Sequence, residues 1–74
     1  MKKLREIIAE TFEIKEEEIE SSHSPDDIEN WDSLGQLKLI NNIESEFNIV
    51  FTMEEIFQIM TIADIYNIMD KKTK

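Results

Sequence analysis

The sequence predicts an all-α fold: a small four-helix bundle with a long loop between the first and second helices and a short third helix. Apolar residues recur at helical spacing, helix-start signals precede the later segments, and the 74 residues include one Gly and one Pro. No stretch of useful length alternates apolar and polar residues, as a half-buried strand would. A chain of this length is expected to form a single domain, residues 1–74.

The first helix is predicted near residues 2–13, where one face repeats at i, i+3, i+4, i+7 and i+8. The positions on that face are Leu4, Ile7, Ile8, Thr11 and Phe12. The polar, acidic segment that follows is expected to be a long loop. Within it, Ser24 and Pro25 precede two aspartates, which is the start signal of a helical turn.

Three further helices are predicted near residues 33–47, 53–58 and 62–70. Either Asp32 or Ser33 can be the N-cap of the second, Gln36 would complete a capping box with Ser33, and Asn48 marks its end. The sequence TMEE forms a capping box before the third helix, and TIAD is a weaker start for the fourth. The expected core comprises Ile8, Phe12, Leu39, Ile43, Phe47, Ile62 and Ile65.

Composition and charge exclude several classes of function. The formal net charge is -9, from 17 acidic and 8 basic residues, which argues against nucleic acid as a partner. There is no cysteine and one histidine, so no metal site is expected. No apolar run approaches the ~20 residues of a membrane span, and the N-terminus lacks the apolar stretch of a signal peptide. The protein is therefore expected to be cytoplasmic.

Ser33, at the start of the second helix, has two interpretations from spacing alone. It can be an N-cap, the commonest use of such a serine. It can also be an exposed site of covalent attachment, because free N–H groups and the helix dipole favour a phosphate at that position. Hydrolytic catalysis has weaker support, since His23 is the single candidate base and a triad also needs an orienting carboxylate and an oxyanion hole. An enzyme is not expected.

A helical wheel separates the faces of the second helix. At about 100° per residue, the core stripe falls opposite Leu34, which shares its side with Lys38 and Asn41. Leu37 lies at the edge of the core stripe. Single exposed apolar residues are common, but Leu34 and Leu37 together form a candidate contact patch for a partner protein beside Ser33.

The segments DSLGQLKLI, ESEFNIVF and MTIADIYNIM resemble the acyl carrier protein family over nearly the whole chain. The resemblance implies a bundle of acyl carrier type in which Ser33 bears a 4'-phosphopantetheine arm, taken from coenzyme A by a phosphopantetheinyl transferase. The thiol of the arm would hold an acyl or aminoacyl group as a thioester. Asp32 matches the Asp beside the family's attachment serine, and Leu34 matches its exposed, partner-contacting Leu.

The resemblance also implies partners, namely an acyl-loading ligase or synthase and downstream transferases, and a monomeric carrier. Recognition is expected to use Asp32 with six further residues, Leu34, Leu37, Lys38, Asn41, Glu54 and Glu55. Trp31 before the Asp-Ser pair and Lys38 on the second helix favour a specialised biosynthetic pathway. The alternatives are a carrier of fatty-acid synthesis and an unmodified acidic helical adaptor that binds proteins through its second helix.

Overall fold

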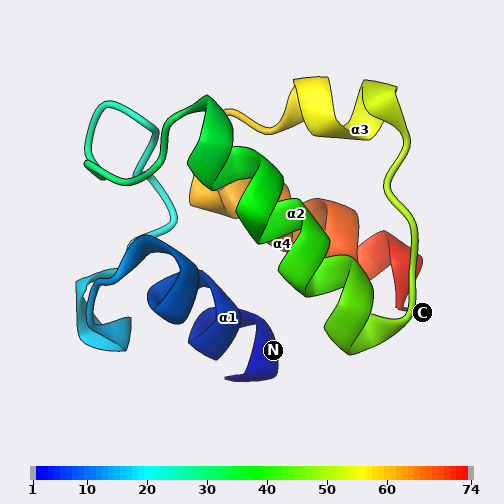
Figure 1. Cartoon of the computed structure of the whole chain (residues 1–74), viewed down its shortest axis with the longest axis horizontal. Helices are drawn as coiled ribbons and strands as arrows, with labels where there is room; N and C mark the ends of the chain where they lie inside the picture. The colour runs from blue at the N-terminus through cyan, green and yellow to red at the C-terminus, as the bar shows by residue number, and fades with distance from the viewer. Residues whose placement is uncertain (1, 74) are drawn as a thin grey trace.

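A computed structural model describes residues 2–73, and within them the chain is helical with no β-strand. The elements in order are α1 (Lys2–Phe12), the 3₁₀ turn η1 (Glu16–Glu18), α2 (Ser33–Phe47), α3 (Met53–Gln58) and α4 (Ile62–Lys72). In Figure 1, α2 crosses the middle of the molecule in front of α4, with α1 to one side and α3 to the other. The predicted all-α, four-helix fold class is confirmed.

Left-handed residues end the first two long helices. Glu13 has φ 57° and Asn48 has φ 56°. After α1, the Ile14 N–H donates to the Ala9 carbonyl at 3.0 Å; after α2, the Ile49 N–H donates to the Glu44 carbonyl at 3.2 Å. Both are Schellman-type ends, in which the next apolar residue packs back on the core. The observed α1 therefore ends at Phe12, one residue before the predicted end at residue 13.

The capping signals of the last two helices are present as the sequence predicts. The Thr52 hydroxyl accepts the Glu55 N–H, and the Glu55 carboxylate accepts the Thr52 N–H at 2.8 Å. Thr61 and Asp64 form the same pair at the start of α4. That helix continues to Lys72, two residues beyond the predicted end, where basic side chains suit its C-terminus.

The loop between α1 and α2 is pinned to the helices at several points. Buried Ile19 and Ile28 anchor it to the core. The Asn30 side chain donates to the Phe12 carbonyl at 2.8 Å. A short 3₁₀ turn at Glu16–Glu18, which the sequence did not predict, lies within it. The segment after Ser24 forms one hydrogen-bonded turn, in which the Asp27 N–H donates to the Ser24 carbonyl at 2.9 Å. This turn does not continue into a helix.

This loop also caps α4. The Ile62 N–H donates to the His23 carbonyl at 2.9 Å, and the Ala63 N–H donates to the Ser21 carbonyl at 3.0 Å. The first N–H groups of a helix have no partner within the helix itself. Two of these N–H groups in α4 therefore donate to backbone carbonyls of a segment about forty positions earlier in the chain.

One apolar core joins all four helices and the loop. Six of the seven residues predicted for the core are buried; the prediction was wrong for Phe47, which is half-buried because it ends α2 where the chain turns away at Asn48. Trp31, expected at a half-buried edge, is 2% exposed and stacks on Phe12 with ring centroids 5.3 Å apart. The remaining buried hydrophobic residues are Leu4, Ile7, Ala9, Ile19, Ile28, Ile40, Phe51, Ile59, Ile68 and Met69.

Candidate functional site

The N-cap of α2 is Asp32, and Ser33 is the first helical residue. Asp32 has extended backbone, and its Oδ1 accepts the Gly35 N–H at 2.7 Å. Its carbonyl accepts the Gln36 N–H at 2.8 Å. Of the two caps that the sequence left open, the structure thus selects Asp32, and the Ser33–Gln36 capping box is not formed. Among residues 2–73 the exposed Ser33 hydroxyl has no hydrogen-bond partner.

Gly35 lets the chain fold tightly over the start of α2. A Cβ at this position would overlap the backbone carbonyl oxygen of Asn30 and crowd Oδ1 of Asp32 at 3.3 Å. Because Asn30 is itself held to the Phe12 carbonyl, the backbone before the helix has little room to retreat. The glycine that looks unfavourable in a helix therefore fixes the position of the Asp32–Ser33 pair.

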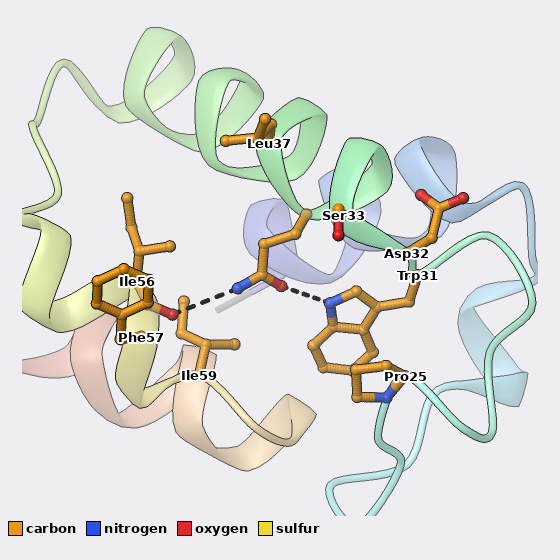
Figure 2. Close-up of a pocket in the computed structure, with 9 residues that line it drawn as sticks. Pro25, Trp31, Asp32, Ser33, Leu37, Ile56, Phe57 and Ile59 are labelled. Atoms are coloured by element: carbon orange, nitrogen blue, oxygen red, sulfur yellow. Dashed lines mark hydrogen bonds between the residues drawn. The ribbon is translucent and has the colours of Figure 1, made fainter.

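A groove of about 630 Å³ opens beside Ser33, between α2, α3 and the loop. Figure 2 shows Ser33 at its edge, at the start of α2. The groove is mostly apolar, and Leu37 from α2 faces Phe57 from α3 across it. Its other lining residues are Pro25, Trp31, Asp32, Ile56 and Ile59.

A polar bridge crosses the floor of this groove. The Trp31 indole N–H donates to Oε1 of Gln36, and Nε2 of Gln36 donates to the Ile56 carbonyl at 3.4 Å. Both bonds are drawn in Figure 2. We call this pair of bonds, centred on Gln36, the Gln36 bridge; it ties the loop, α2 and α3 together.

The predicted partner residues on α2 are all exposed. Leu37 is 56% exposed and lines the Ser33 groove, whereas Leu34, 61% exposed, lies with Lys38 toward the Thr11 end of α1. Asn41 follows on the outer surface of α2. Ser33 therefore lies between two exposed leucines that point to different neighbouring helices.

The two predicted partner residues on α3 differ in their surroundings. Glu54 is exposed, while Glu55 is half-buried and pairs with Lys72 at 2.8 Å. The pKa of the Glu55 carboxyl is lowered below its ordinary value of 4.5, chiefly by the hydrogen bond from Lys72. The hydrogen bond from the Thr52 N–H is the second cause. Lys72 also donates to the Val50 carbonyl at 2.9 Å, so Glu55 holds the C-terminus of α4 against the start of α3.

The sequence-based site contained Glu54 and Glu55 of α3 but not the apolar residues of that helix. Phe57 is 74% exposed at the rim of the groove, and Met53, four positions earlier on the same side of the helix, is also exposed. The four-residue spacing of Met53 and Phe57 is the feature of the sequence that could have predicted an exposed apolar face on α3. No pattern in the sequence indicates the other groove residues, Pro25, Ile56 and Ile59, because only the tertiary packing of the loop and α3 brings them to Ser33.

His23 is engaged in its own turn, with Nδ1 accepting the Glu20 N–H at 3.3 Å and Nε2 3.2 Å from the Glu20 carboxylate. Residues 2–73 contain no group of three His, Asp or Glu side chains able to hold a metal ion. No helix among them is long and apolar enough to cross a membrane.

The four-helix fold and the exposed Ser33 at the start of α2 are the features expected of a carrier-type protein. Comparison with protein families agrees: residues 2–69 match the family whose model is described as a phosphopantetheine attachment site. The chain belongs to this acyl carrier family, and the family implies a covalently attached 4'-phosphopantetheine group. No curated protein matches the chain.

Proposed function

We propose that this protein carries an acyl or aminoacyl group as a thioester on a 4'-phosphopantetheine arm attached to Ser33, and presents it to partner enzymes of a specialised biosynthetic pathway. It acts as a carrier and not as an enzyme. The observation that supports Ser33 most directly is its free hydroxyl. Because Asp32 caps the helix, Ser33 is exposed at the first helical position with its oxygen uncommitted.

The start of α2 suits a phosphodiester on Ser33. The first N–H groups of a helix and its dipole stabilise negative charge there. In loading, the Ser33 oxygen forms a bond to a phosphorus of the coenzyme A diphosphate, and the adenosine-bearing phosphate leaves with the electrons of the broken P–O bond. The hydroxyl proton passes to a base of the transferase, since no side chain in residues 2–73 hydrogen-bonds to that oxygen.

Asp32 is proposed to assist loading without giving up its capping role. Oδ1 is committed to Gly35, while Oδ2 has no hydrogen-bond partner among residues 2–73. A carboxylate oxygen is a suitable ligand for Mg²⁺ or for a basic group of the transferase. The residue thus shapes the helix start with one oxygen and is free to contact the transferase with the other.

The proposed docking surface is formed by Leu34, Leu37, Lys38, Asn41, Glu54 and Glu55 with the newly found Phe57. Its α2 portion carries no free carboxylate: Glu44 accepts the Phe51 N–H at 2.8 Å, and Glu46 pairs with Lys3 at 3.3 Å. Of the surface residues on α2, Lys38 is the charged one, and this apolar to basic α2 portion supports partners of a specialised pathway, including an acyl-loading ligase or synthase and downstream transferases, over those of fatty-acid synthesis. The monomeric state and the cytoplasmic location remain predictions.

Intact mass spectrometry tests the attachment site. The protein, Ser33→Ala and Ser45→Ala are incubated with coenzyme A, Mg²⁺ and a broad-specificity phosphopantetheinyl transferase. Ser45 is a suitable control because it is an exposed serine later on the same helix. We expect the mass of one phosphopantetheine to be added to the parent and to Ser45→Ala, and none to Ser33→Ala at equal unfolding stability. No addition to any of them, with a second carrier loaded in the same tube, would favour the unmodified adaptor.

A further inference from the structure

We propose that the Gln36 bridge closes the seam between α2 and α3 to the cargo, so that the cargo stays in the open groove beside Ser33. The carrier then suits short acyl or aminoacyl groups, and a long alkyl chain would be left exposed outside it. This inference rests on the proposed attachment of the arm to Ser33. It assigns Gln36 and Trp31 a role in selecting the length of the cargo.

The bridge lies where an acyl chain carried on the arm of Ser33 would have to enter the seam between α2 and α3. Ser33, Gln36 and Leu37 are three and four positions apart, so they share one side of α2. The Gln36 side chain bonds the Trp31 indole N–H at one atom and the Ile56 carbonyl at another, and dashed lines in Figure 2 mark both bonds. An apolar chain entering the interior there would have to displace Gln36 from both of its partners.

Displacing Gln36 is unfavourable because the Trp31 indole N–H is poorly placed to find another acceptor, whereas the Ile56 carbonyl would keep the Ile59 N–H, which it accepts at 3.2 Å. Trp31 is 2% exposed, so an indole N–H that loses Gln36 has little access to water. The ring itself is fixed by stacking on Phe12. Burying hydrocarbon beside an unpaired polar group would offset the gain from removing that hydrocarbon from water.

The interior behind the bridge is already filled. Leu39 and Ile43 of α2 and Ile62 and Ile65 of α4 are 0–1% exposed. Protein interiors are close-packed, and inserting extra methylenes forces side chains off their preferred rotamers. A long chain would therefore have to separate α2 from α4 in addition to breaking the bridge.

The groove outside the bridge offers a place for a small cargo. Its volume of about 630 Å³ lies within the range of small-molecule sites, and its walls are mainly Leu37, Ile56, Phe57 and Ile59. A group tethered at Ser33 is held beside these side chains at high effective concentration. Leu37 and Phe57 are both more than half exposed, so the groove is open at its rim and leaves the far end of a long chain in water.

Amide NMR of loaded protein tests this directly. Acetyl- and octanoyl-phosphopantetheine forms are prepared from the corresponding acyl-coenzyme A with the transferase. We expect the octanoyl form to differ from the acetyl form at groove amides such as Leu37 and Phe57, and not at core amides such as Ile43 and Ile65. Shifts at the core amides in the octanoyl form of the unaltered protein would overturn the proposal.

Thioester cleavage by hydroxylamine gives a second readout, because a thioester drawn into a water-excluded site reacts more slowly. We expect the acetyl and octanoyl forms to react within about twofold of each other, whereas a chain held in the core would slow the octanoyl form by about tenfold or more. Gln36→Met keeps the side-chain length and removes both hydrogen bonds; Trp31→Phe keeps a buried ring and removes the N–H. In either variant, we expect the octanoyl form to react more slowly than it does in the parent, because the chain can then enter as far as the filled interior.

Gln58→Met is the matched control, since Gln58 is an exposed glutamine on α3 outside the groove lining. It should behave as the parent does. Identical cleavage rates in Gln36→Met, Trp31→Phe and the parent, with all three folded, would overturn the role of the bridge. If the arm is never found on Ser33, the proposed function fails and this inference fails with it; if loading succeeds and core amides shift, only this inference fails.

Discussion

The Oδ1 atom of Asp32 lies 2.7 Å from the backbone nitrogen of Gly35, and this hydrogen bond caps α2. In doing so it leaves the adjacent serine hydroxyl without a structural task. The first turn of α2 thus divides two roles between neighbouring residues: Asp32 stabilises the helix end, and Ser33 is available for chemistry.

Asp32→Ala is expected to destabilise the fold by about 1 kcal/mol, the usual effect of removing an N-cap. Asp32→Asn should keep the cap and the stability, because asparagine accepts the same hydrogen bond. Its loading rate should nevertheless fall about tenfold through loss of a charged contact to the transferase. Urea unfolding and timed mass spectrometry measure the two effects. Equal loading of Asp32→Asn and parent protein would remove the proposed role of the charge.

Gly35→Ala is expected to destabilise the protein, although alanine is favoured over glycine in a helix by about 1 kcal/mol. The added Cβ meets the Asn30 carbonyl, and overpacking of this kind costs about 1–3 kcal/mol. Urea unfolding gives the difference. Asn41→Ala, an exposed change on the same helix, is the control, and its free energy of unfolding should lie within about 0.5 kcal/mol of the parent value. A more stable Gly35→Ala protein would contradict the packing argument.

The Glu55–Lys72 pair predicts an acid-dependent loss of stability. The pKa of Glu55 is lower in the folded protein than its ordinary value of 4.5, chiefly through the Lys72 hydrogen bond. A lowered folded-state pKa contributes stability above the unfolded value, and that contribution is lost as the pH falls from about 4.5 through the folded value. Glu55→Gln should therefore flatten the fall of unfolding free energy in acid. Glu54→Gln, one residue away and exposed, should leave the pH profile unchanged.

Phe57→Ser is expected to separate docking from folding. Phe57 is 74% exposed, so its loss should change stability by no more than about 0.5 kcal/mol. If α3 forms part of the docking surface, the KM for loading by a transferase should rise while the unfolding curve stays in place. Ser33 remains intact in this variant, so the final mass should match the loaded parent. An unchanged KM together with unchanged affinity for an acyl-loading partner would exclude Phe57 from that surface.

The sequence predicted those features that depend on neighbours within a few residues. The capping pairs Thr52–Glu55 and Thr61–Asp64 and the left-handed Asn48 are local, and all are present. The 3₁₀ turn at Glu16–Glu18 was missed because three consecutive glutamates carry no apolar periodicity.

The groove could not be predicted for the opposite reason. Ile56 reaches Gln36 across twenty positions of chain, and Trp31 reaches its stacking partner Phe12 across nineteen, by residue number. Phe47 shows the limit of the helical wheel: it lies on the correct face of α2, but a wheel does not show where covering elements stop. Which side chains line the groove depends on how the loop and α3 pack on α2.

The contacts between the loop and α4 bear on how this small protein opens. The carbonyls of Ser21 and His23 hold the amide protons of Ala63 and Ile62, so these protons exchange with solvent only when the loop leaves. The loop between α1 and α2, which the sequence predicts as a long polar connection, therefore belongs to the same cooperative unit as α4. A protease that cut between Ser21 and Ser24 would release the start of α4 along with the loop, and hydrogen exchange at Ile62 and Ala63 would record that event.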